Sequence, residues 1–341
     1  MKAAFYTRTG AAREVLQLAD LPEPAPGVGE VKVRLHWSGV NPSDVKSRAD
    51  LRGRGMPYPR VIPHSDGAGV VESVGPGVPA SRVGERVWVW NGAFGRPDGT
   101  AAECIVLPAA QAVALPANVS MEAGACLGIP ALTALHAVRG YGGVAGQRVL
   151  VAGGAGAVGH YAVQFARLLG ARQVIASVSS PAKAALALEA GAHATVDYRA
   201  EPLAARVAEL TEGEGLDRVI EVDVAANGAA DAEMLRPGGC AVVYGSGKGS
   251  FELPFFPQIA KNLSWHFFIV YSLSPADRAA AEATLRWMLE AGLLQHRIDR
   301  RLDLADIVEA HEAVESGKLV GNLVLRLPGA AAVSGAGDHH G

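Results

Sequence analysis

The stretch from residue 148 to residue 163 constrains the fold of this chain more than any other. It combines a short apolar run, a glycine-rich turn and the start of a helical pattern. Gly154, Gly156 and Gly159 fit G-x-G-x-x-G, in which the glycines allow a tight turn, close approach of the backbone to a pyrophosphate, and close helix–strand packing. The amides at the helix N-terminus would face the anion. The pattern therefore predicts a dinucleotide-binding turn.

The sequence after this turn alternates between apolar runs and helical patterns. Short apolar runs of this kind are typical of strands that are covered on both faces, and strands alternating with helices build a doubly wound parallel sheet. The predicted strands are Gln173–Val178, Ala194–Tyr198, Leu216–Val224, Cys240–Tyr244 and Ser264–Tyr271, and the predicted helices are Pro181–Glu189, Pro202–Leu210 and Asn227–Leu235. Helices are also expected at Met121–Leu127 and Ala131–Arg139, separated by Pro130.

The first 120 residues show a different pattern of apolar runs and are expected to be rich in β-structure. Short apolar runs alternate there with Gly and Pro, and only Pro42–Arg48 suggests a helix. Beyond the parallel sheet, the chain predicts helices at Pro275–Leu294 and Leu304–Ser316 and a closing strand at Asn322–Leu327. The expected fold is therefore α/β, with a β-rich domain at 1–122 completed by 275–328, a Rossmann domain at 123–274, and a disordered tail at 329–341.

Composition narrows the classes of function. The chain has 341 residues, a net charge of −3 and no basic tract, which argues against a dedicated nucleic-acid binder. Its three cysteines are widely spaced, as expected in a reducing compartment. The N-terminus reads as a strand rather than a signal peptide, and no apolar run is long enough to span a membrane. A soluble cytoplasmic protein is expected.

The residues after the second strand of the nucleotide-binding unit indicate which nicotinamide cofactor is bound. NAD-specific folds place an Asp or Glu there, but no acidic residue occurs from His160 to Leu188. The region holds Ser177, Ser179, Ser180 and Lys183 instead, and their hydroxyl and ammonium groups could bind a 2′-phosphate, which favours NADP(H). The alternatives are a solvated lysine and serines that cap a helix.

Several segments together resemble the medium-chain dehydrogenase/reductase superfamily, and within it the zinc-free quinone reductases of the ζ-crystallin type. They are G-V-N-P-S-D at 39–44, I-P-H-S-D-G-A-G-V-V at 62–71, G-I-P-A-L-T-A at 128–134 and G-N-L-V-L at 321–325. The resemblance implies a GroES-like β-rich catalytic domain beside the Rossmann domain. Two positions depart from the family pattern: His64 stands where Gly is usual, and Lys46 where Tyr is frequent.

The resemblance also bears on metal binding. The positions that hold the catalytic zinc in related alcohol dehydrogenases carry Asn41, Ser65 and Ile129 here, none of which supplies a thiolate or an imidazole. His64 is adjacent to one of these positions, and we expect it to be structural or solvent-exposed rather than a ligand. No metal is therefore expected.

The glycine turn, its neighbours and the resemblance together define a predicted set of cofactor-binding residues. Tyr198, Gly245, Ser246, the segment 268–270 and Asn322 enter this set through the resemblance, although each could simply be a packing or turn residue. The full predicted set is Asn41, Pro130, Thr133, Gly154, Ala155, Gly156, Ala157, Val158, Gly159, Ser177, Ser179, Lys183, Tyr198, Val222, Gly245, Ser246, Phe268, Ile269, Val270 and Asn322.

The resemblance implies an NADPH:quinone reductase in which the cofactor delivers a hydride without a metal. Asn41, Asp44 and Lys46 are the predicted catalytic residues. Asn41 could hydrogen-bond an acceptor oxygen or order a turn, Asp44 could orient the ribose or cap a helix, and Lys46 could stabilise a developing anion.

Two other functions remain open at this point. One is an NADPH-dependent double-bond reductase acting on alkenals or enones, because the sequence does not reveal the shape of the pocket. The other is a non-catalytic NADPH-binding protein, crystallin-like or RNA-associated, although the low charge argues against RNA. The resemblance further implies a homodimer formed through the edge strand 264–271, since a bare apolar edge strand invites pairing.

Overall fold

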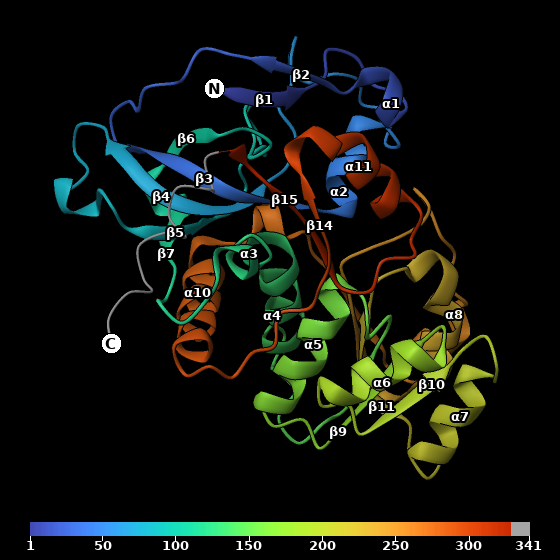
Figure 1. The fold of residues 1–341 in the computed structure, drawn as a ribbon. Coiled ribbons are helices and arrows are strands. Elements are labelled where there is room, and N and C mark those ends of the chain that lie inside the picture. The colour runs from blue at the N-terminus through green and yellow to red at the C-terminus, as the bar shows by residue number, and fades with distance from the viewer. Residues whose placement is uncertain (329–341) are drawn as a thin grey trace. The chain divides into compact units, whose positions relative to one another are not determined.

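The structure is a computed structural model that describes residues 1–328; the predicted disordered tail, 329–341, lies outside the described residues. The chain divides into two compact units, Met1–Ile129 with Ile298–Gly341, and Pro130–Arg297. In Figure 1 the first unit carries the blue, cyan and red parts of the chain and the second unit the green, yellow and orange parts.

The first unit is built around a seven-stranded sheet with the order β14-β15-β3-β4-β5-β7, in which β6 also pairs with β3. The long central strand β3 pairs antiparallel with β4, β6 and β15. A separate antiparallel pair is formed by β1 and β2. The strands are β1 Lys2–Phe5, β2 Gln17–Asp20, β3 Glu30–Val40, β4 Asp66–Val74, β5 Arg86–Val89, β6 Cys104–Pro108, β7 Ala112–Ala114, β14 Ile298–Asp303 and β15 Asn322–Arg326.

Buried and less buried side chains alternate along the first part of the central strand β3. Val31, Val33 and Leu35 point to one face and are fully buried, as a strand of period two requires. They pack in one core with Ile105 and Leu107 of β6. The α-helices of this unit in the described part of the chain are α1 Ala12–Val15, α2 Pro42–Arg48, α3 Met121–Gly124 and α11 Ile307–Glu315.

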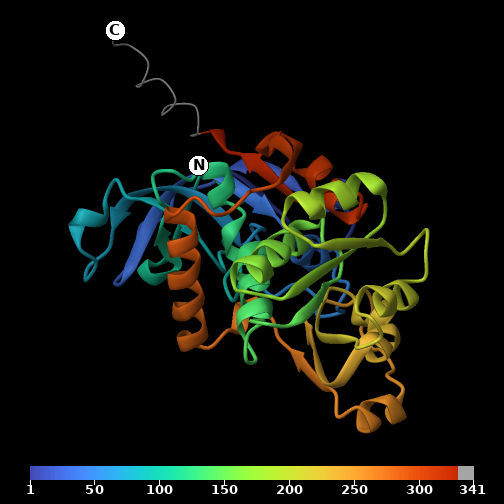
Figure 2. The same cartoon turned by 90° about the horizontal axis from the view of Figure 1, so that it is seen from below.

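The second unit contains a six-stranded parallel sheet with the order β10-β9-β8-β11-β12-β13. Its strands are β8 Arg148–Val151, β9 Gln173–Val178, β10 Ala194–Asp197, β11 Leu216–Glu221, β12 Leu235–Val243 and β13 Ser264–Phe267. Its helices are α4 Leu132–Arg139, α5 Ala157–Leu168, α6 Pro181–Glu189, α7 Leu203–Leu210, α8 Val224–Met234, α9 Phe255–Ala260 and α10 Pro275–Glu290. Figure 2 shows the green and yellow helices of this unit beside the strands of the sheet. The predicted fold class, an α/β chain with a doubly wound parallel sheet and a separate β-rich unit, is confirmed.

Some local features differ from the predictions. The predicted strand Ser264–Tyr271 ends at Phe267 and is followed by a 3₁₀ turn at Val270–Ser272. Pro130 does not separate two helices but lies inside a π-helical turn, Leu127–Ala131, that leads into α4. The edge strand β14 was not predicted, because its sequence I-D-R-R-L-D is strongly charged and none of its residues is fully buried.

The unit bounds also differ from the predicted domain bounds. The helix α10 packs on α4, and the Arg278 guanidinium donates to the Val270 carbonyl at 2.6 Å, so contacts group α10 with the second unit. The sequence had assigned this helix to the first domain. Contact units need not coincide with domains, and the predicted domain bounds stay a prediction.

Within residues 1–328, every helix is too short or too polar to span a lipid bilayer.

Candidate functional site

The glycine-rich turn connects β8 to α5 and brings these two elements very close together. A Cβ on Gly159 would lie 2.1 Å from the Gly153 carbonyl oxygen, and a Cβ on Gly154 would lie 2.5 Å from Ala176 Cβ of β9. The residue with positive φ is Gly153, at +67°, rather than Gly154. A Cβ on Gly156 would meet only the Gly153 oxygen, at 3.3 Å, which leaves the turn open on that side. Packing within the protein therefore requires glycine at 154 and 159, while Gly156 leaves space for the close approach of a dinucleotide.

The predicted residues Ala155, Ala157 and Val158 belong to this turn and to the first turn of α5, where Gly156 is the N-cap. The amides that begin α5 have no helical partner of their own. A twelve-residue helix with a free N-terminus provides both N–H donors and a partial positive charge for a phosphate.

Ser177 and Ser179, two of the serines predicted to bind phosphate, lie in different environments. Ser177 is buried, and its hydroxyl accepts the Gly153 amide at 3.1 Å, so it holds the glycine turn in place. Ser179 is half-buried and accepts a hydrogen bond from Lys183 Nζ at 3.2 Å. The neighbouring Ser180 caps α6 by accepting the Lys183 amide. The structure thus brings together Ser179 and Lys183 at the carboxyl end of β9.

The other predicted cofactor contacts of this unit gather along the same edge of the sheet. They follow the carboxyl ends of four parallel strands: Tyr198 after β10, Val222 after β11, Gly245 and Ser246 after β12, and Phe268, Ile269 and Val270 after β13. Ligands of open α/β sheets bind at this edge. Pro130 lies in the π-helical turn and Thr133 is buried on α4.

A cavity of 480 Å³ lies beyond β13 in the same unit. Phe268 and Ile269 line it together with the His136 and Tyr141 rings and the Asp277 side chain. His136 contacts Phe268, with ring centroids 4.6 Å apart. Two predicted cofactor residues therefore border an aromatic hollow.

In the first unit, Asn41 lies between two buried carboxyl groups. Its Nδ2 donates to Asp66 Oδ2 at 2.9 Å, and its side chain also hydrogen-bonds Asp44. Asp44 Oδ2 in turn accepts the Asn41 amide at 2.8 Å, which forms a capping box at the start of α2. Burial raises the pKa of Asp44 to about 7, against the hydrogen bonds from Asn41. Asp44 therefore caps the helix α2, and Asn41 orders the turn before it.

Asp66 is a member of this cluster that was not predicted. It is fully buried at the start of β4, and its Oδ2 also accepts the Ile129 amide at 2.9 Å. Burial and the nearby Asp44 raise its pKa well above the usual range, against the Asn41 and Ile129 hydrogen bonds. A single acid at the start of an apolar strand, in S-D-G-A-G-V-V, was the only signal in the sequence.

The remaining predicted residues of the first unit lie near the same end of β3. Lys46 is half-buried on α2, one turn after the capping box. Asn322 is buried at the start of β15, whose next residue, Leu323, pairs with Val40 at the end of β3. The structure therefore places Asn41, Asp44, Lys46 and Asn322 in one region of this unit.

His64 is structural, one of the two roles expected of it. It is fully buried, its backbone φ is +76°, and its Nε2 lies 2.9 Å from His311 Nε2 of α11. Its Nδ1 contacts Ser38 Oγ at 3.0 Å, which in turn contacts Thr100 Oγ1 at 2.8 Å.

The direction of these hydrogen bonds determines the tautomers of both rings. The Thr100 hydroxyl donates to the Asp66 carbonyl, so Ser38 must donate to Thr100. His64 Nδ1 must then donate to Ser38, which leaves His64 Nε2 as acceptor and His311 Nε2 as donor. Both imidazoles are neutral in this arrangement.

Zinc does not fit the positions that hold it in related dehydrogenases. The Asn41 amide nitrogen donates to Asp66, Ser65 offers only a hydroxyl, and Ile129 has no side-chain ligand atom. Across the part of the chain that the structure describes, no group of three or more His, Cys, Asp and Glu side chains is arranged to hold a metal. No chemical step is assigned to a metal here.

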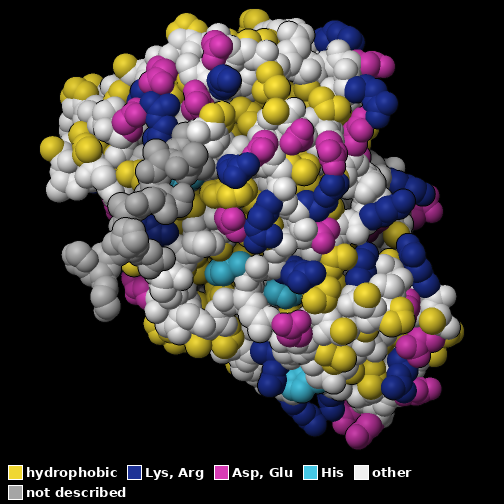
Figure 3. All heavy atoms as spheres, in the orientation of Figure 1, with side chains coloured by type: hydrophobic (Ala, Val, Ile, Leu, Met, Phe, Trp, Pro, Cys, Tyr) yellow, Lys and Arg dark blue, Asp and Glu magenta, His cyan; other side chains and the backbone are white. Residues whose placement is uncertain are grey.

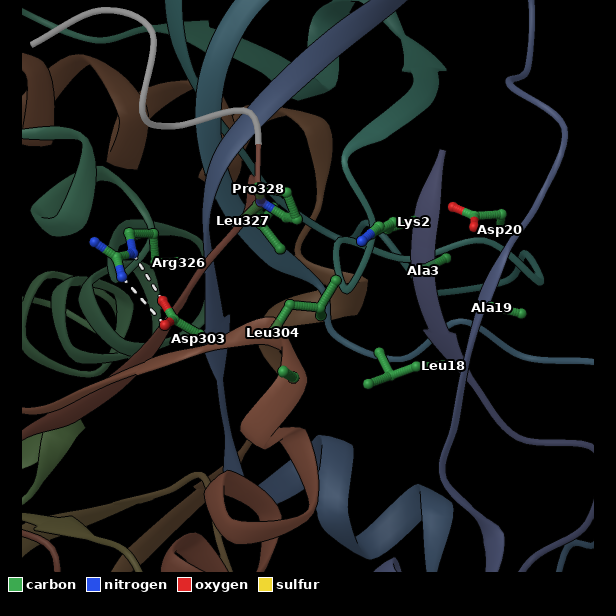
Figure 4. Close-up of a pocket in the computed structure, with 11 residues that line it drawn as sticks. Lys2, Ala3, Leu18, Ala19, Asp20, Asp303, Leu304, Arg326, Leu327 and Pro328 are labelled. Carbon is green, nitrogen blue, oxygen red and sulfur yellow. Dashed lines mark hydrogen bonds and ion pairs between the residues drawn. The ribbon is translucent and has the colours of Figure 1, made fainter.

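A second cavity, of 570 Å³, lies in the first unit and contains none of the predicted site residues. Figure 4 shows Leu18, Leu304 and Leu327 around it, with the Asp303–Arg326 ion pair at one side. It is not included in the candidate site.

Comparison with known proteins agrees with this arrangement. Residues 27–117 match the alcohol dehydrogenase GroES-like domain, and residues 157–290 match the family described as zinc-binding dehydrogenase. A quinone oxidoreductase of Pseudomonas aeruginosa is 32% identical over 92% of this chain and 95% of its own length. A 2-haloacrylate reductase of a Burkholderia species is 30% identical over 88% and 92%.

Two solved structures extend the comparison. A mycobacterial protein complexed with NADPH superposes with a TM-score of 0.83 at 30% identity, covering 96% of this chain and 99% of its own. An NAD-dependent alcohol dehydrogenase superposes with a TM-score of 0.86 at 31% identity, with the same coverage.

Proposed function

The chain belongs to the quinone oxidoreductase family of the medium-chain dehydrogenase/reductase superfamily, and from this premise we propose that it is an NADPH-dependent, zinc-independent quinone reductase. Family membership makes it an oxidoreductase. The choice of NADPH, of a metal-free mechanism and of quinones as acceptors is the proposal.

The observation that carries the proposal is the pairing of Ser179 and Lys183 beside the glycine turn. A hydroxyl and an ammonium 3.2 Å apart can both donate to a 2′-phosphate, whose negative charge a carboxylate would repel. β9 ends without an acidic residue, and the acid at the end of β10, Asp197, accepts the Arg199 amide. This arrangement favours NADP(H) although one structural relative uses NAD.

When bound, NADPH supplies a hydride, so the acceptor must already be electrophilic. We propose that Lys46 stabilises the negative charge that develops on the acceptor oxygen. The Asn41 amide is already occupied by two carboxyl groups, so we propose that Asn41 and Asp44 position α2 and thereby Lys46. No residue of this set requires a metal.

The proposal is tested by titrating the protein with NADPH and NADH in parallel. We expect tight binding of NADPH, and fast oxidation of the bound cofactor when phenanthrenequinone is added in a stopped-flow experiment. The variant Lys183→Met should weaken NADPH binding by about 10-fold or more, since it removes a charge-assisted contact, and should leave NADH binding unchanged.

The matched control is Lys318→Met, which removes an exposed lysine of the other unit. The proposed role of Lys183 in binding the 2′-phosphate would be contradicted if the wild-type protein bound NADH more tightly than NADPH. It would also be contradicted if Lys183→Met weakened the binding of both cofactors equally.

A double-bond reductase is the second candidate, and the 2-haloacrylate reductase among the relatives favours it. Alkenals and enones have a polarised C=C that accepts a hydride by the same chemistry. Turnover of hexenal without turnover of phenanthrenequinone would replace the quinone proposal with this one.

A non-catalytic NADPH-binding protein is the third candidate. On the face shown in Figure 3, Lys and Arg side chains are interspersed with Asp and Glu, which does not favour RNA binding there. Tight NADPH binding with neither acceptor reduced would support this candidate.

We further propose that the protein is a homodimer formed through β13. This strand is at the edge of the parallel sheet, and within residues 1–328 no further strand pairs with its outer side. Exposed aromatic side chains surround it: Phe267 is 54% exposed, and Phe255 and Phe256 of α9 are each 73% exposed. An apolar edge of this kind is suited to a second copy of the chain.

The cytoplasmic location is also a proposal. Cys104, Cys126 and Cys240 are all free, and the first two are buried. Free thiols are typical of a reducing compartment.

A further inference from the structure

Two buried carboxyl groups face each other beneath the edge of the parallel sheet. Glu221 is the last residue of β11 and is fully buried, and Asp231 lies in the middle of α8 with 1% exposure. Their side chains lie within hydrogen-bonding reach of each other. Neither residue belongs to the predicted site or to the proposed mechanism.

The hydrogen-bond partners of the carboxyl oxygens indicate how many protons the pair holds. Glu221 Oε1 accepts from the Asp223 amide and from Asn227 Nδ2, so this carboxyl group is stabilised as an anion. Glu221 Oε2 and Asp231 Oδ2 have no other donor among the described residues. Two ionised carboxylates could only repel each other there, because both would be acceptors. One proton between them satisfies both oxygens.

We propose that Glu221 and Asp231 share a single proton, with Asp231 as the acid, and that this pair positions the turn Val222–Asp223 for NADPH binding. The inference rests on the proposed function, because it takes NADPH as the ligand of this edge. Glu221 and Asp231 are positioning residues, because they act on the cofactor contacts through the turn Val222–Asp223.

The turn Val222–Asp223 connects the two carboxyl groups to the predicted cofactor contacts. The Asp223 amide is held by Glu221, and the Asp223 carboxylate accepts the Gly247 amide at 2.6 Å. A Cβ on Gly245 would lie 2.1 Å from the Val222 carbonyl oxygen, so the two loops pack tightly against each other. Displacing Glu221 would therefore move both Val222 and the Gly245–Ser246 segment.

The charged and titratable groups around the pair are few. From the turn, Asp223 adds a negative charge. Tyr244, directly after β12, is half-buried, and its pKa is raised by burial and by Glu221. Lys261, after α9, donates to carbonyls at the end of α8 rather than to the carboxyl groups. On α7, Arg206 and Glu209 pair with each other. The described neighbours named here offer no cation to neutralise a second charge.

Loss of the shared proton would place two negative charges in contact inside the protein. Burial, and then the Glu221 charge, raise the pKa of Asp231 to about 9. If the doubly ionised form does not hold the turn, the apparent Kd for NADPH at pH 9.5 should be about fourfold higher than at pH 7, because only about a quarter of the protein keeps the proton.

The test is direct titration of NADPH by fluorescence at pH 7 and pH 9.5, using wild type, Asp231→Asn and Glu221→Gln. Each amide keeps a hydrogen bond between the two side chains but cannot lose a proton there. We expect the wild-type Kd to rise about fourfold and the Kd of each variant to change less than about twofold. Glu233→Gln, an exposed carboxyl-to-amide change on α8, should behave as wild type.

A second readout does not involve the cofactor. A carboxyl group whose pKa is raised by folding makes the protein less stable as pH rises from the unfolded pKa towards the folded one. Between pH 5 and pH 8, the Tm of wild type should therefore fall relative to that of Asp231→Asn. If the two side chains had only a structural role, the Tm of wild type and that of Asp231→Asn would change with pH in parallel.

The outcomes separate the inference from the function. An alkaline rise in Kd that persists in both amide variants, or parallel stability curves, would overturn the shared proton. Failure of wild type to bind NADPH at pH 7 would instead contradict the proposed function, and the stability curves would still decide whether the proton is shared.

Discussion

At the scale of single residues, His64 adopts a backbone conformation that usually requires glycine. Its positive φ is a conformation in which glycine carries no penalty, and His adopts it more readily than β-branched residues do. The bond to His311 and the chain of hydroxyls through Ser38 and Thr100 hold the ring in the interior. A backbone conformation that disfavours most side chains is thus compensated by buried hydrogen bonds.

The same pair predicts how stability depends on acid pH. Burial and the proximity of His311 lower the pKa of His64 well below its usual value, and burial with nearby Arg48 lowers the pKa of His311 to about 3. The unfolded chain takes up protons below about pH 6.5 while the folded protein does not, so stability is present above that pH and is lost as pH falls.

We therefore expect the variant His311→Gln to lose about 1–2 kcal/mol less free energy of unfolding than wild type between pH 7 and pH 5. Urea unfolding at the two pH values measures this difference. Burial also lowers the pKa values of His160 and His296 to about 4, so part of the acid sensitivity should remain. Identical pH dependence in the two proteins would show that the pair is not kept neutral.

At the scale of elements, the contact between β8 and α5 depends on one missing side chain. The Cβ of an alanine at 159 would lie 2.1 Å from a backbone oxygen of the preceding turn, which cannot move without displacing the helix. Overpacking of this kind typically costs about 1–3 kcal/mol.

Gly159→Ala should therefore lower the free energy of unfolding by about 1–3 kcal/mol and weaken NADPH binding, because the start of α5 would shift away from the phosphates. Thermal unfolding and fluorescence titration check the two effects. Gly249→Ala is the matched control, since a Cβ there has no atom within 4 Å and φ is not positive. Equal behaviour of the two variants would contradict the close contact.

At the scale of the whole molecule, the exposed edge of the parallel sheet predicts self-association. Sedimentation of the wild-type protein at micromolar concentration should show a dimer. Phe267→Asp should shift the population towards monomer, because it places a charge beside the open edge of β13. Leu188→Asp on α6 changes another exposed apolar side chain, away from that edge, and should not shift the population. A monomeric wild type would rule out the proposed dimer.

The sequence by itself determined the parallel sheet, because its signals are local. Glycines at fixed spacing, short apolar runs and helix-capping residues each act within a few positions, and they located β8, α5 and β9 correctly. The absence of an acid after β9 and the presence of Ser179 and Lys183 are likewise local, and the structure brings this pair together.

Only the tertiary structure decided which groups lose contact with water and which partners they meet. Asp66 and Asn41 lie far apart in sequence, as do His64 and His311, and nothing local indicates that they touch. Glu221 and Asp231 lie on a strand and the helix after it, yet their shared burial depends on how α8 packs on the sheet. Burial and long-range pairing set the protonation of these groups, and both arise only when the chain has folded.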